Sequence, residues 1–139
     1  MTTVLADAKL GVMVSDSNFT DDDRVWLGRK VFRVKGNLVG VAGSVKEWSR
    51  VLDWMRKGGK EPAFGNCSLL VLSDKGLHLY TSPKPEKIES GIDAIGTGAK
   101  ATMCAYEALG FVNPRRAVSI VCKHDAGSRS PVRVYRLRG

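Results

Sequence analysis

Pairs of short apolar runs joined by tight turns are the feature that most constrains this chain. Apolar and polar residues alternate with a period of two, the spacing of β-strands with one buried face. A turn over 35–37 joins the runs 30–34 and 38–42, and a turn over 73–76 joins 69–72 and 77–80. Because short turns connect antiparallel neighbours, most strand pairing should be antiparallel. Further strands are expected at 3–6, 11–15, 92–95 and 131–137, and the polar residues 18–23 are expected to form a loop.

The segment after Ser44 has the spacing of an amphipathic helix. Its apolar residues recur three to four positions apart, at Trp48, Val51, Leu52 and Met55. Ser44 followed by Glu47 has the pattern of a capping box, and Gly58-Gly59 ends the helix. This is the only helix expected between Ser44 and the strand at 69–72, and residues 60–67 are expected to form a loop.

Two more helical segments lie near the carboxyl end. Residues 99–109 have helical spacing, and Pro114 is suited to the first position of another helix. That helix runs to about Cys122, although 118–121 could instead be a strand. Strands separated by helices predict sheets with helices packed outside them, and 139 residues suit a single domain, 1–139.

Composition excludes several classes of protein. The chain is 43% hydrophobic and 26% charged, which is ordinary for a globular domain and excludes a disordered chain or a disulfide scaffold. Three cysteines, Cys67, Cys104 and Cys122, lack CxxC spacing and are expected to be buried thiols in the cytoplasm. No apolar run approaches the roughly 18 residues of a membrane span, and the amino terminus does not resemble a secretory signal.

The net charge of +8 raises the question of an acidic partner. Basic residues are spread along the chain, without a block of five like charges or an aromatic-rich motif for single strands. A solvated basic surface is therefore favoured over a nucleic-acid binder, and an acidic partner stays open.

Gly96-Thr97-Gly98 follows a predicted strand and precedes a predicted helix, the outline of a dinucleotide-binding turn. The hairpins that open the chain do not fit the serial βαβ units of that fold. A tight strand-to-helix turn is the favoured interpretation.

The second residue offers a possible nucleophile. Removal of Met1 would give Thr2 a free α-amine beside its own hydroxyl. An α-amine with a pKa near 8 can accept the hydroxyl proton at neutral pH, so one residue can supply both nucleophile and base.

An ordered set of short motifs gives this threonine its context. Thr2-Thr3-Val4 opens a strand, Ser15-Asp16-Ser17 ends the next, and Arg29-Lys30-Val31 opens a hairpin. The set continues with Ala42-Gly43-Ser44, Gly96-Thr97-Gly98 and Asp125-Ala126-Gly127-Ser128. This order resembles the proteasome β-subunit family of N-terminal nucleophile hydrolases, in particular its short bacterial and phage members, and is similar in plan to HslV.

The resemblance implies a fold and a set of site residues. The fold would be an α+β, four-layer αββα sandwich of two mostly antiparallel sheets between helices. Thr2 would be the nucleophile. The Lys30 ammonium would keep the α-amine of Thr2 neutral, and Asp16 would hold Lys30 in position. The backbone N–H of Gly43 would stabilise the oxyanion. Thr97, Asp125 and Ser128 would surround the amine.

The implied activity is that of a threonine-type endopeptidase that needs no metal or cofactor. The substrate would be a polypeptide, and the active form a homo-oligomeric ring of six or seven subunits, with ring stacking and any unfoldase partner left open. Trp26 lies in a polar segment and could contribute to an interface or fold back onto the core. Two alternatives remain: a catalytically silent ring protein that keeps Met1, and a hydrolase of small amides with the same chemistry.

Overall fold

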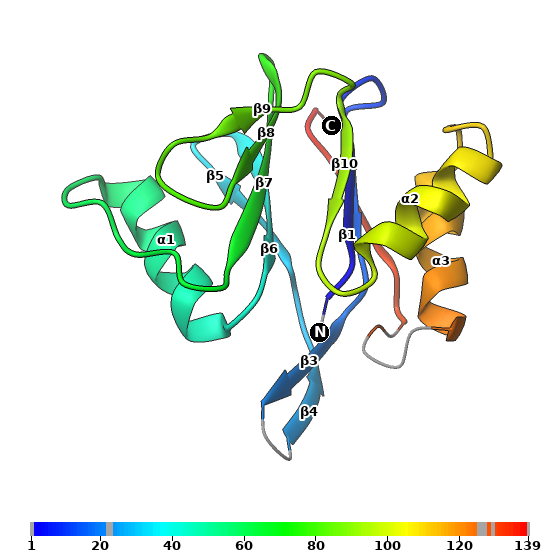
Figure 1. The fold of residues 1–139 in the computed structure, drawn as a ribbon, viewed down its shortest axis with the longest axis horizontal. Helices are drawn as coiled ribbons and strands as arrows, with labels where there is room; N and C mark the ends of the chain where they lie inside the picture. The colour runs from blue at the N-terminus through cyan, green and yellow to red at the C-terminus, as the bar shows by residue number, and fades with distance from the viewer. Residues whose placement is uncertain (1, 22–23, 125–127, 129, 139) are drawn as a thin grey trace.

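Two antiparallel sheets lie face to face in the centre of the molecule (Figure 1). The structure, a computed structural model, describes residues 2–21, 24–124, 128 and 130–138, with the backbone alone for 20–21 and 24–27. The first sheet has the strand order β10-β1-β2-β11. Its strands are β1 (Val4–Asp7), β2 (Val12–Ser15), β10 (Ile92–Ile95) and β11 (Arg133–Arg136).

The second sheet follows chain order, β5-β6-β7-β8-β9. Its strands are β5 (Val31–Val34), β6 (Asn37–Ala42), β7 (Ser68–Ser73), β8 (Gly76–Tyr80) and the short β9 (Glu86–Lys87), which the sequence did not predict. All neighbours are antiparallel, as expected from the tight turns. The β5–β6 turn has two residues rather than the expected three, because Val34 pairs directly with Asn37. Lys35 and Gly36 occupy it with φ of 52° and 82°, the positive angles of the hairpin turn whose twist matches the strands.

Helices cover the outer faces of both sheets (Figure 1). The helix α1 (Val45–Lys57) packs on β5 and β6. The helices α2 (Ala99–Ala108) and α3 (Pro114–His124) pack on β10, β1 and β2. These layers confirm the four-layer αββα sandwich. Residues 118–121 are helical, so the strand alternative is wrong, because Ala117, Val118 and Val121 form one buried helical face.

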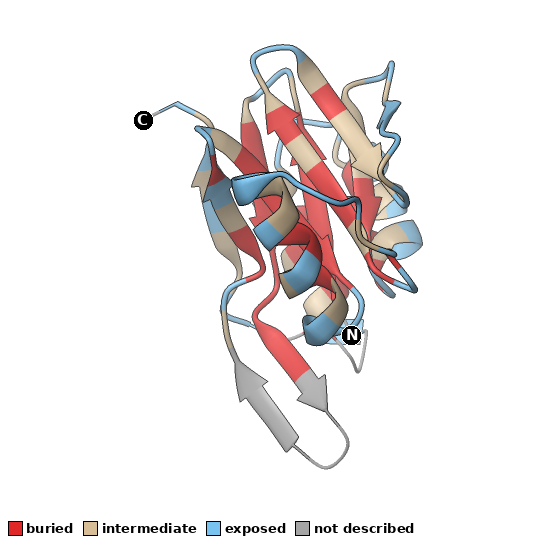
Figure 2. Cartoon of the chain, turned by 90° about the vertical axis from the view of Figure 1, so that its left-hand side faces the viewer, coloured by how far each residue is buried: buried red, intermediate tan, exposed pale blue. Residues whose placement is uncertain are grey.

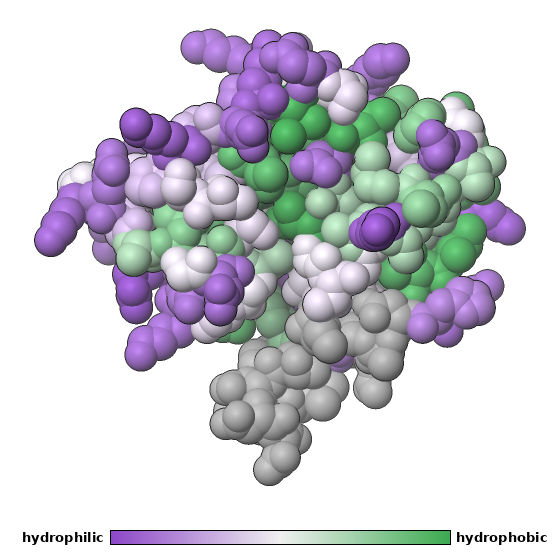
Figure 3. All heavy atoms as spheres, viewed as in Figure 1, coloured by the Kyte–Doolittle hydropathy of each residue, from purple (hydrophilic) through white to green (hydrophobic). Residues whose placement is uncertain are grey.

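Three apolar clusters hold these layers together. One lies between the sheets, with Leu38, Leu70 and Met13 among its buried members. A second lies under α1 and a third under α2 and α3. Figure 2 shows the buried residues concentrated along the strands, and Figure 3 shows apolar surface along the middle of one face with hydrophilic residues around it.

Residues 18–23 were expected to form a loop, and this prediction is wrong. Asn18–Asp21 forms β3 and Arg24–Leu27 forms β4, a hairpin that extends away from the two larger sheets (Figure 1). Phe19 supplies an apolar anchor at its base, because its ring is buried in the cluster under α1. The side chain of Trp26 lies outside the described part of the chain.

The expected capping box is also wrong. Ser44 occupies the position before α1, but its side chain makes no capping hydrogen bond within the described part of the chain. The Glu47 carboxylate instead accepts the backbone N–H of Asn66 at 2.8 Å. Glu47 therefore fastens the segment before β7 to the first turn of α1.

The cysteines are not uniformly buried as expected. Cys67 is buried, Cys122 is half-buried and Cys104 is exposed. Burial, reinforced by the nearby Glu47 carboxylate, raises the pKa of Cys67 to about 11. The Cys67 thiol is thus protonated at neutral pH and a poor nucleophile.

Candidate functional site

A buried polar network surrounds the start of β1. Thr2 is 6% exposed and Thr3 is fully buried, and Asp16 directly follows β2. The Thr3 N–H donates to the Asp16 carboxylate at 3.0 Å, and the Asp16 N–H donates to the Thr3 carbonyl at 3.1 Å. These bonds extend the β1–β2 ladder by one step beyond the Val4–Ser15 pair. Asp16 therefore lies next to Thr3, the residue that follows Thr2.

Lys30 joins this network from the other sheet. Its Nζ lies 2.9 Å from the Asp16 carboxylate oxygen, and both side chains are fully buried. Lys30 immediately precedes β5, so the ion pair connects the two sheets at one end of the sandwich. The Lys30 Nζ also lies 5.1 Å from the ring centroid of Phe19, a cation–π contact. An ion pair removed from water holds a fixed geometry, because either charge alone would be costly to bury.

Ser128 reaches the same network from the segment after α3. Its hydroxyl oxygen lies 2.7 Å from that of Thr3, and both residues are buried. Ser128 was expected near the amine of Thr2, and the structure places it on the side chain of Thr3. Asp125 lies outside the described residues.

Thr3 is the residue that sequence reasoning missed. It contacts Asp16 through its backbone and Ser128 through its side chain, so it fixes the strand that carries Thr2. The threonine doublet at the start of β1 was the available signal. A second threonine, fully buried, requires partners for its hydroxyl.

Thr2, Gly43 and Thr97 meet at one pocket. The pocket has a volume of about 460 Å³, and short, uncharged residues line it: Thr2, Ala42, Gly43, Ser44, Asn66, Ser68, Gly96 and Thr97. Gly43 links β6 to α1 with a φ of 104°, and a Cβ there would lie 2.8 Å from the Cα of Cys67. Only glycine fits this position. The amino terminus of α1 follows it, which adds the positive end of a helix dipole to this part of the pocket.

The Gly96-Thr97-Gly98 turn packs directly on the first residues of the chain. A Cβ on Gly96, whose φ is 98°, would lie 1.9 Å from the Thr2 carbonyl oxygen. The Gly98 N–H donates to that oxygen at 3.3 Å, and a Cβ on Gly98 would lie 2.1 Å from the Thr3 hydroxyl. The glycines thus allow backbone to approach backbone beside Thr2, in the tight turn that the sequence predicted.

Other kinds of site are not evident in the described residues. Within them, His, Cys, Asp and Glu form no group of three that could hold a metal ion. The helices described are also too short or too polar to cross a membrane.

The facing antiparallel sheets and their helical layers form an αββα sandwich, with Thr2 just before its first strand. No known sequence family matches this chain, and neither does any curated protein. Solved structures, by contrast, match its fold. HslV from Trypanosoma brucei superposes with a TM-score of 0.75 at 21% identity, covering 96% of this chain and 98% of HslV.

A second protein, BPH from Thiobacillus denitrificans, has the same architecture. In complex with epoxomicin it gives a TM-score of 0.72 at 14% identity, covering 99% of this chain and 100% of BPH. Another BPH structure gives 0.70 at 13% identity, covering 99% and 98%. The chain therefore has the HslV-like fold of a proteasome β-subunit.

Proposed function

We propose that this protein is a threonine-type endopeptidase whose nucleophile is Thr2 after removal of Met1. The observation that carries the proposal is the buried Lys30–Asp16 ion pair, which is hydrogen-bonded to the backbone of Thr3, the residue next to Thr2. A buried ammonium at the start of β1 would favour a neutral α-amine on Thr2. The fold of HslV and BPH supports the same chemistry.

The proposed reaction has two steps. The α-amine of Thr2 takes the hydroxyl proton while Oγ attacks the carbonyl carbon of a peptide bond. The C–N bond then breaks, the departing amine receives the proton, and an ester to Thr2 remains. Water attacks the ester, which releases the new carboxyl group and restores the threonine hydroxyl.

Gly43 and the pocket would contribute to the same reaction. The backbone N–H of Gly43, just before α1, is proposed to donate to the oxyanion. Such an interaction typically lowers the barrier by about 3 kcal/mol. Thr97, at the rim of the pocket, and Ser128, through Thr3, are proposed to position the reacting residue. Asp125 is proposed to lie beside the α-amine of Thr2, as the family resemblance implies.

Intact mass and peptide turnover together test the proposal. Active protein should lack Met1, because the amine must be free to act as a base. Thr2→Ala should abolish turnover, and Thr2→Ser, which keeps a hydroxyl, should retain part of it. The exposed Thr81→Ala should be unaffected. Full retention of Met1 in a preparation that cleaves peptides would overturn the mechanism.

The same assay separates the alternatives. A panel of peptides and small amides should show turnover of the peptides, whereas turnover of the amides alone would indicate a small-amide hydrolase. Protein that retains Met1 and cleaves neither would be a silent member of the fold.

We expect the active form to be a homo-oligomeric ring in the cytoplasm. Light scattering after size exclusion should show the mass of the ring. A monomer at micromolar concentration would contradict the ring.

A further inference from the structure

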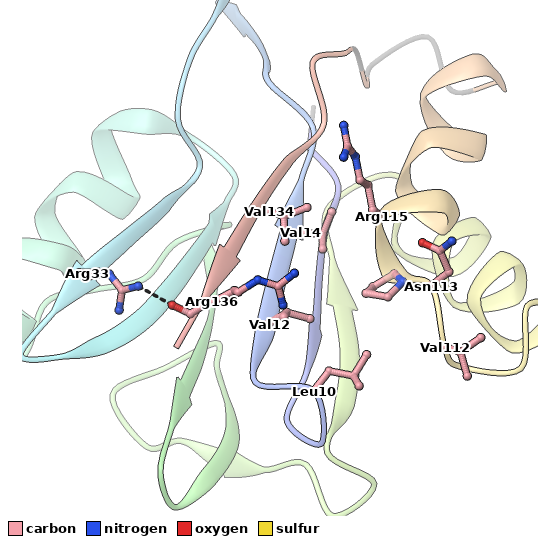
Figure 4. A pocket seen from close by; sticks show the side chains of 10 residues that line it. Leu10, Val12, Val14, Arg33, Val112, Asn113, Arg115, Val134 and Arg136 are labelled. Carbon is pink, nitrogen blue, oxygen red and sulfur yellow. Dashed lines mark hydrogen bonds between the residues drawn. The ribbon is translucent and has the colours of Figure 1, made fainter. Parts of the chain in front are cut away.

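An apolar groove on the outer face of the first sheet shares no lining residue with the pocket at Thr2 (Figure 4). It has a volume of about 650 Å³ and lies between β2, β11 and the start of α3. Val12, Val14 and Val134 lie side by side on the two strands, and Leu10 and Val112 also line the groove. The groove exists because α2 and α3 pack on β10, β1 and β2, while β11 at the sheet edge carries no helix of its own.

Exposed apolar side chains gather at this groove. Val112 is 73% exposed, Leu10 is 48% exposed and Val134 is 38% exposed. In the described residues only two other large apolar side chains are comparably exposed, and one of them, Phe111, adjoins Val112. Scattered exposed apolar residues are normal, but a group of them in one hollow marks a binding surface.

Three arginines stand around the same groove: Arg33 from β5, Arg115 from α3 and Arg136 from β11 (Figure 4). The Arg33 guanidinium donates to the backbone carbonyls of Arg136 and Leu137, which fixes it across the gap between the sheets. No carboxylate lines the groove in the part of the chain that the structure describes. The guanidinium groups therefore present an unbalanced positive charge beside an apolar floor, and their planar fork suits carboxylates.

We propose that this groove binds a short acidic segment of a partner protein, in which carboxylate side chains alternate with aliphatic ones. The aliphatic side chains would cover the exposed Leu10, Val112 and Val134, and the carboxylates would pair with Arg115 and Arg136. A nucleic acid would match the arginines but not the valines, and no aromatic ring lines the groove among the described residues for a base to stack on. This gives part of the net charge of +8 a specific role.

Fluorescence anisotropy with designed peptides tests the proposal. The probe is a short fluorescein-labelled peptide in which Glu alternates with Leu, and its control replaces every Glu with Gln. The acidic peptide should bind and the Gln peptide should bind at least about tenfold more weakly, because charge-assisted hydrogen bonds are lost. The double variant Arg115→Gln/Arg136→Gln should weaken binding of the acidic peptide by a similar factor. Val134→Ser should also weaken it.

A matched variant removes the same charge elsewhere. Lys57→Gln/Lys60→Gln changes the last residue of α1 and a residue just after it, on the opposite side of the sandwich, and both lysines are exposed. It should bind the acidic peptide like the wild type. Equal weakening by this control, or no binding of the acidic peptide at all, would overturn the proposal.

Two further outcomes would identify another occupant. Tighter binding of single-stranded DNA, lost in Arg115→Gln/Arg136→Gln but unchanged in Val134→Ser, would replace the peptide with a nucleic acid. Loss of self-association in the arginine variant, without peptide binding, would identify a second copy of this chain as the occupant. The substituted arginines and lysines are exposed and Val134 is 38% exposed, so the variants should fold.

Discussion

The two large sheets differ in what they bury. The strands β6 and β7 at the centre of the second sheet bury almost nothing but apolar side chains, among them Leu38, Val41, Leu69 and Leu70. The first sheet buries polar groups as well, including Thr3, Asp7, Ser15 and, just after β2, Asp16. Burying polar groups reduces stability unless each finds a partner. We therefore expect substitutions inside the second sheet to change stability, and substitutions at the buried polar groups of the first sheet to change the proposed turnover as well.

The largest effect is expected at the buried ion pair that joins the two sheets. Lys30→Met removes the ammonium from the fully buried Asp16 and should lower the free energy of unfolding by about 3–5 kcal/mol, besides abolishing turnover. Denaturant unfolding at neutral pH measures this. Lys35→Met, exposed in the β5–β6 turn, is the control and should have little effect. Adding Asp16→Asn to Lys30→Met should restore part of the stability but not the turnover.

An apolar deletion in the second sheet should separate stability from activity. Leu70→Ala removes a fully buried side chain between the sheets and should cost about 2–5 kcal/mol of unfolding free energy. Under conditions where the variant is folded, its kcat/KM should equal that of the wild type. Leu10→Ala, at an exposed position, should change stability by less than about 0.5 kcal/mol. A large fall in kcat/KM for Leu70→Ala would remove the distinction between the sheets.

A smaller effect is expected at the buried polar pair under α2. The Tyr106 hydroxyl donates to the Asp7 carboxylate at 2.5 Å, and Tyr106→Phe should cost about 1–3 kcal/mol because Asp7 loses that donor. Burial, and then the bond to Asp7, raises the pKa of Tyr106. The folded state thus holds a proton that the unfolded state releases above pH ~10, so wild-type stability should fall as the pH rises beyond that value. Tyr106→Phe should lack this particular fall.

The smallest effect is expected on β10. Burial raises the pKa of Asp93 above its ordinary range, so its charged form is less favourable in the folded state than in the unfolded one. Asp93→Asn should therefore raise the melting temperature slightly at pH 7. The gain should vanish below pH ~4, where the carboxyl is protonated in both states. A thermal melt series across pH measures this, with the exposed Asp53→Asn as control.

Most of the fold follows from local sequence patterns. The hairpin of β5 and β6 and the helix α1 were predictable because their periodicities of two and of three to four are strong. The β3–β4 hairpin was not, because Asn18–Asp21 is polar and only Phe19 anchors it to the core. The capping box failed because Glu47 has a tertiary partner, the N–H of Asn66, that no local pattern reveals.

The site was predictable in part for a different reason. The family resemblance implied that Asp16 would pair with Lys30, and their side chains lie 2.9 Å apart in the structure. Nothing local indicated that Thr3 would be the residue joining Asp16 to Ser128, because those contacts span 13 and 125 positions of the chain. Contacts at such separation depend on the packing of whole sheets.

The closeness of Gly96 to the carbonyl of Thr2 has a consequence for genetic selection. Any side chain at position 96 would displace the first strand, since even a Cβ would lie 1.9 Å from that oxygen. In a library of all single substitutions screened for peptide hydrolysis, position 96 should therefore be as depleted of variants as position 2. A mutational map alone would then rank Gly96 with the proposed nucleophile, although the structure gives it only the role of leaving room for the backbone of Thr2.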